Sequence, residues 1–102
     1  MKSGVLIKTH ESAGKKITAV ADKELIGKKF EEGERCLDVT GRFYKGKEKT
    51  EEEALKILKE STNTNMVGKK AVALGIKSGI ITEDSIILIK GIPHAISIKY
   101  GI

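Results

Sequence analysis

The side chain with the clearest capacity for chemistry is His94, which closes the segment Gly91-Ile92-Pro93-His94. Histidine can act as an acid, a base or a metal ligand near neutral pH. Proline fixes its own backbone and favours an extended residue before it, so such a turn can present one side chain rigidly. His94 is therefore the candidate catalytic residue, although a turn histidine that only caps a carbonyl is a simpler explanation.

Two lysines form a second candidate site. Asn65 is typical of a helix N-cap, and a helix predicted from Asn65 to Ser78 places Lys69 and Lys70 in its first turn. Cations oppose the helix dipole at that end unless an anion is bound there. Lys69 and Lys70 are therefore candidate binding residues for a phosphate group, beside the capping Asn65.

Several signatures of catalysis and metal binding are absent from the sequence. There is no phosphate loop, no dinucleotide-binding glycine motif and no Cys-x-x-Cys pair. His10-Glu11 begins like a zinc-protease motif, but Gly14 stands where the second histidine would be. We therefore expect no cofactor and no metal, and we interpret the lone Cys36 as a small core residue.

Length, charge and apolar content limit the class of protein. The 102 residues suit one domain spanning residues 1–102. The first apolar run is too short for a membrane span or a signal peptide, and a single cysteine excludes an internal disulfide. We therefore expect a cytoplasmic protein without a membrane partner.

The net charge of +5 is distributed unevenly. Residues 1–30 carry seven Lys against three acids (+4), residues 31–60 seven Lys or Arg against nine acids (−2), and residues 61–102 five Lys against two acids (+3). Excess cations at both ends favour an RNA partner. Genome composition or growth at high temperature explains the same excess of lysine without an RNA partner.

Periodicity predicts strands at 4–9, 17–22 and 34–40, helices at 50–60 and 65–78, and strands at 86–89 and 96–100. Thr50 and Glu53 form a capping box at the first helix, and a helical turn capped by Asp22 follows the second strand. Residues 45–49 are expected to be a charged loop. Residues 86–89 are apolar on both faces, which is typical of a central strand. The order β-β-β-α-α-β-β predicts an α+β fold with a mostly antiparallel sheet and two helices packed on one face.

Five segments in this order resemble an uncharacterised archaeal family, the domain of unknown function number 424. They are 21–27, 30–33, Phe43-Tyr44-x-Gly46, 65–68 and Gly91-Ile92-Pro93-His94-Ala95. The resemblance implies an association with translation, because members tend to be encoded near translation genes. It carries over no catalytic residue, but polar residues within the segments could form one site: Asp22, Glu24, Asn65 and His94.

Three hypotheses about function remain. The first is a non-catalytic accessory factor of translation that binds RNA or the ribosome through a basic surface, and we expect no enzymatic activity. The second is a small enzyme or metal-binding protein using His94 with Asp22 or Glu24, which requires these side chains to converge. The third is a protein-interaction module or a homodimer paired through an edge strand.

Overall fold

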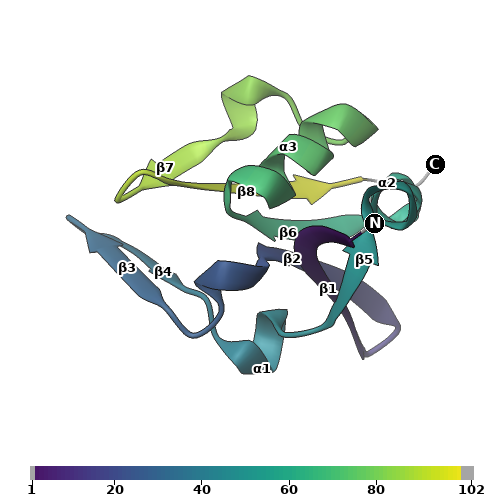
Figure 1. Cartoon of the computed structure of the whole chain (residues 1–102), viewed down its shortest axis with the longest axis horizontal. Coiled ribbons are helices and arrows are strands. Elements are labelled where there is room, and N and C mark those ends of the chain that lie inside the picture. The colour runs from purple at the N-terminus through teal and green to yellow at the C-terminus, as the bar shows by residue number, and fades with distance from the viewer. Residues whose placement is uncertain (1, 100–102) are drawn as a thin grey trace.

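A computed structural model describes residues 2–99 of the chain (Figure 1). Its strands are β1 (Lys2–Ser12), β2 (Lys15–Asp22), β3 (Lys29–Glu32), β4 (Arg35–Asp38), β5 (Lys47–Thr50), β6 (Asn63–Val67), β7 (Ile87–Ile89) and β8 (Ile92–Ile98). Its helices are α1 (Gly41–Tyr44), α2 (Glu51–Glu60) and α3 (Lys69–Ser78), with short 3-10 helices η1 (Lys23–Leu25) and η2 (Glu83–Ser85). The fold is α+β, as predicted.

Six strands form the main sheet in the order β5-β1-β2-β6-β8-β7, and β3 pairs with β4 in a separate hairpin. The sheet is mostly antiparallel, but β2 and β6 run parallel. A parallel pair needs a long crossover, and here the chain passes through β3, β4, α1, β5 and α2 before β6 begins. The predicted element order missed this mixed topology. Tyr100, which was assigned to the last strand, lies outside the described residues.

One side of the sheet, here called the helix face, is covered by α2 and α3 (Figure 1). The capping box that starts α2 is formed, with Glu53 N donating to Thr50 Oγ1 at 3.1 Å and Thr50 N donating to Glu53 Oε1 at 3.0 Å. Apolar side chains from both helices and four central strands fill this core: Val5, Ile7, Val20, Ala54, Leu58, Met66, Ala71, Val72, Leu74 and Ala95.

The other side of the sheet, here called the opposite face, is covered only in part. η1, α1 and the β3–β4 hairpin lie over the half of the sheet that contains Ala21, Val67 and Ile89. Leu25, Leu37, Val39 and Tyr44 come from these covering segments and are all buried. The two halves of this face therefore differ in exposure, which matters for the site described below.

The predicted helix from Asn65 is wrong in its first four residues. Asn65 lies in β6, which pairs with β2 on one side and β8 on the other, and α3 begins only at Lys69. Thr64 and Met66 are buried on the helix face, a period of two that defines a strand. Gly68 then has φ +107°, a conformation that no helix contains. Asn65 therefore does not cap α3.

The prediction that residues 86–89 form a central strand is also wrong. β7 contains three residues and lies at the edge of the sheet, where Ile87 is 44% and Leu88 58% exposed. An apolar run is compatible with an edge strand when it is very short.

Residues 29–50 depart further from the predicted pattern. Cys36 is exposed, because it lies on the outer side of the β3–β4 hairpin, while Leu37 and Val39 face the core. The segment expected as a charged loop forms β5, and Gly46 before it passes so close to the Ile7 carbonyl that no Cβ fits there. Short charged segments become strands here because an existing strand offers them a partner.

Candidate functional site

Asp22 occupies the N-terminus of α3. Its side chain is buried, and its carboxylate accepts hydrogen bonds from Ala71 N at 2.8 Å and Lys70 N at 3.1 Å. Burial raises the pKa of Asp22, while these two backbone donors act in the opposite direction. A Cβ at Gly68 would collide with this carboxylate, so glycine is needed there. The anion that the helix dipole favours at this position is thus supplied by the chain itself.

Two lysines of α3, one in its first turn and one in its last, lie beside carboxylates. Lys70 Nζ lies 3.9 Å from Glu24 Oε1, and Lys77 Nζ lies 2.7 Å from Glu51 Oε1. A hollow of about 410 Å³ beside α3 is lined by Lys2, Lys70 and Lys77, but Glu51 lines it too. The reason for expecting a phosphate at Lys69 and Lys70 is therefore removed by Asp22, whose carboxylate already occupies the N-terminus of α3.

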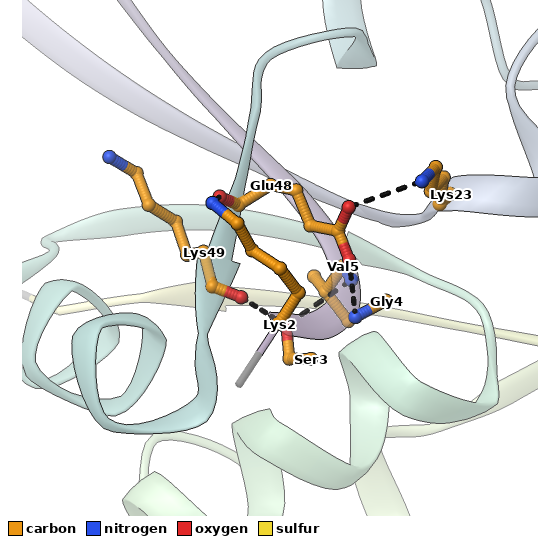
Figure 2. Close-up of polar contacts among 7 residues, drawn as sticks. All are labelled: Lys2, Ser3, Gly4, Val5, Lys23, Glu48 and Lys49. Atoms are coloured by element: carbon orange, nitrogen blue, oxygen red, sulfur yellow. Dashed lines mark hydrogen bonds and ion pairs between the residues drawn. The ribbon is translucent and has the colours of Figure 1, made fainter.

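Glu48 holds further lysines at this end of the sheet (Figure 2). Its carboxylate accepts hydrogen bonds from Gly4 N at 3.1 Å and from Lys23 Nζ at 3.2 Å. The ammonium of Lys23 lowers the pKa of Glu48. Lys2 Nζ donates to the Glu48 carbonyl at 3.1 Å. These contacts join β1 to β5 where their register shifts, and they explain the local charge as structural.

On the opposite face, Asn65 joins Tyr44 and His94. Asn65 Oδ1 accepts hydrogen bonds from Tyr44 OH at 2.7 Å and from His94 Nε2 at 3.2 Å. Because a carbonyl oxygen only accepts, His94 carries its proton on Nε2 and leaves Nδ1 as an acceptor. Burial lowers the pKa of His94 and raises that of Tyr44 to about 12, so both are neutral near pH 7.

The network continues from Tyr44 toward the second histidine. Phe43 meets Tyr44 edge to face with centroids 4.8 Å apart, and it stacks on His10 at 4.6 Å. His10 Nε2 lies 2.8 Å from the Phe43 carbonyl oxygen and donates to it. His10 therefore fixes α1 to β1, which is a structural role.

The sheet separates the four polar residues that were grouped as one site. Successive residues of a strand point to opposite faces, so Asp22 shares the helix face with Val20. Asn65 and His94 lie on the opposite face. Glu24 and Asp22 both contact Lys70, the first through its ammonium group and the second through its backbone N–H. Neither acid contacts His94. Among residues 2–99 no group of three or more His, Cys, Asp or Glu side chains is placed to hold a metal ion.

A basic groove at the other end of the sheet was missed by the sequence interpretation. Its volume is about 440 Å³, and it is lined by Gly14, Lys15, Lys16, Thr62, Asn63, Ile98 and Lys99. We call it the lysine groove. Among its described lining residues, none is acidic. Lys16 Nζ lies 3.8 Å from Glu11 outside the groove, between two side chains that are more than 60% exposed, so this pair screens it weakly.

The lysine groove depends on three chain segments far apart in sequence. The start of β2 supplies Lys15 and Lys16, the start of β6 supplies Asn63, and Lys99 follows directly after β8. Lys99 Nζ donates to the Lys59 carbonyl at 2.8 Å, which holds its side chain in place. The only local signal in the sequence was the Gly14-Lys15-Lys16 turn.

The fold and its groove define the class of the molecule: an α+β protein whose mixed six-stranded sheet carries two helices on one face and a basic groove at one end. Within residues 2–99 every helix falls short of the length and apolarity needed to cross a bilayer. A family described as a protein of unknown function (DUF424) matches residues 10–100, and the chain belongs to this family, as the resemblance indicated.

A solved structure has the same fold. The crystal structure of an uncharacterized conserved protein from Methanopyrus kandleri superposes with a TM-score of 0.81 at 24% sequence identity, covering 96% of this chain and 95% of that one. No curated protein matches the chain. The comparisons therefore establish family and fold.

Proposed function

We propose that this protein is a non-catalytic RNA-binding accessory factor of translation that contacts phosphates through the lysine groove. One observation carries the proposal: Lys15, Lys16 and Lys99 converge in a groove of about 440 Å³ whose described lining residues include no acid. Lysine ammonium groups in such a groove attract the phosphate backbone without reading its sequence. The net charge of +5 adds a long-range attraction.

The lysines at the two lysine-rich surfaces differ in their acidic neighbours. Lys70 and Lys77 face Glu24 and Glu51, so an approaching phosphate would have to compete with carboxylates already in place. In the lysine groove Lys16 has one exposed carboxylate partner, Glu11 at 3.8 Å, while Lys15 and Lys99 have no ion-pair partner among the described residues, and no lining residue is acidic. This difference moves the proposed RNA contact from Lys69 and Lys70, where the sequence suggested it, to the other end of the sheet.

The test is a titration against ribosomal subunits and total tRNA at several salt concentrations. The groove variant Lys15→Gln/Lys16→Gln/Lys99→Gln is compared with Lys28→Gln/Lys56→Gln/Lys90→Gln, which removes the same charge from exposed positions elsewhere. We expect the first to lose affinity and salt dependence and the second to behave like the wild type. Equal behaviour of both variants would refute the groove as the binding site.

A homodimer is the second candidate, because exposed apolar side chains lie along the β7 edge. Leu88 is 58% and Ile87 44% exposed, and strand edges of this kind can pair with a second copy. Analytical ultracentrifugation of the wild type and Leu88→Lys decides this. A dimer that dissociates in the variant supports the candidate, and a monomeric wild type excludes it.

A further inference from the structure

Part of the opposite face is uncovered and continuous with the lysine groove. Ile96 is 51% and Ile98 54% exposed, and both point away from α2 and α3 because Ala95 and Ser97 occupy the helix face. Ile98 lies beside Asn63, and Ile96 beside Asn65, as direct antiparallel partners. We call this surface, formed by Asn63, Asn65, His94, Ile96 and Ile98, the open face.

The open face combines apolar contact area with hydrogen-bonding groups that the protein leaves free. Asn65 Oδ1 is fully used by Tyr44 and His94. In the described part of the chain, however, the Asn65 amide NH₂ and His94 Nδ1 have no protein partner. One is a donor and the other an acceptor, and the exposed isoleucines flank them. Such a mixed surface fits the face and edge of an unpaired base.

Asn63 and Ile98 belong to both surfaces, since each also lines the lysine groove. A strand whose phosphates lie in the groove would therefore bring its next bases onto the open face. A duplex turns its bases inward and presents only backbone and groove edges. We propose that the ligand is single-stranded RNA, with phosphates in the lysine groove and bases on the open face. This inference rests on the proposed function.

In this arrangement the Asn65–His94–Tyr44 network has a positioning role. Tyr44 is buried and fixes the Asn65 oxygen, which in turn orients the His94 ring with Nδ1 free. His94 and Asn65 would then contact the base, while Ile96 and Ile98 supply the apolar surface on which it rests. Replacing the isoleucines leaves this network and the core intact because both side chains are exposed.

The test compares a labelled single-stranded RNA of about 12 nucleotides with the duplex of the same sequence, by fluorescence anisotropy. Three variants accompany the wild type. They are the groove variant described above, the face variant Ile96→Ser/Ile98→Ser, and the control Ile76→Ser, which alters an exposed apolar residue outside the open face and the β7 edge.

We expect the wild type to bind the single strand at least about tenfold more tightly than the duplex, with a salt slope near −2 for three phosphate contacts. The face variant should lose that preference and keep the salt slope, and the control should keep both. Circular dichroism melting curves check that each variant is folded.

The possible failures are distinguishable. Equal affinity for single strand and duplex, or a face variant that binds like the wild type, overturns the open face while leaving the groove proposal standing. Absence of binding to either RNA overturns both. A wild-type dimer that the face variant dissociates shows that the open face is a protein interface, which also overturns the inference.

Discussion

The two ends of the sheet both gather lysines, but their surroundings differ. At the end where α3 begins, Asp22 accepts backbone N–H groups of the helix, and Glu24, Glu48 and Glu51 each pair with a lysine. At the end formed by the β1–β2 turn, Lys15, Lys16 and Lys99 line a groove whose described residues include no acid. Local charge in the sequence therefore does not locate a ligand site, because the fold decides which charges are paired.

The largest expected effect comes from the end of the sheet where α3 begins. Asp22→Ala should lower the free energy of unfolding by about 3 kcal/mol, because one buried and one partly buried backbone donor of α3 lose their acceptor. Urea unfolding followed by circular dichroism measures this. Asp22→Asn, which keeps one acceptor oxygen, should lose clearly less. If Asp22→Ala is as stable as the wild type, the Asp22 cap of α3 contributes nothing to the free energy of unfolding.

The second effect compares the two ends directly. The groove variant should bind RNA at least about tenfold more weakly than the wild type at about 0.1 M salt, since counterion release scales with the phosphates contacted. Lys69→Gln/Lys70→Gln should change the affinity by less than about twofold, because the Asp22 carboxylate already occupies the N-terminus of α3 and Glu24 lies beside Lys70. Anisotropy titrations measure both, and the reverse order would place the RNA at α3.

A smaller effect concerns the network beneath the open face. Tyr44→Phe should lower the free energy of unfolding by about 1 kcal/mol, because the partly buried Asn65 oxygen loses one of its two donors. The phenyl ring retains its edge contact with Phe43. Chemical denaturation tests this, with Tyr44→Leu as the variant that also removes the ring and should be less stable still.

The smallest expected effect is a pH dependence from His94. Burial lowers its folded-state pKa below the ordinary value of 6.5, so the unfolded chain takes up the proton first as pH falls. The contribution of neutral His94 to the free energy of unfolding is therefore complete above the ordinary pKa. It is lost as the pH falls from the ordinary pKa toward the lower pKa of the folded state. Tyr44, the titratable group that faces His94 through Asn65, stays neutral over this range. Wild type should lose stability relative to His94→Gln between pH 7.5 and 5.5, and parallel curves would contradict the assignment.

Local patterns identified much of the fold. The capping box at Thr50 and Glu53, the alternation in β2 and the helical stripe of α3 are encoded within a few residues and were predicted correctly. Segments whose structure depends on a distant partner were not. β5 needs β1, and β6 needs β2 and β8.

The candidate site divides in the same way. The sequence by itself determined the residue types: His94, a side chain that can lose its charge near neutral pH, amide side chains at 63 and 65, and an excess of lysine. Only the tertiary structure decided that Asp22, 49 residues from Ala71, caps α3, and that Lys15, Lys16 and Lys99 share one groove. The physical reason is that charge pairing and burial act through space, where chain segments meet, and sequence neighbours do not record those meetings.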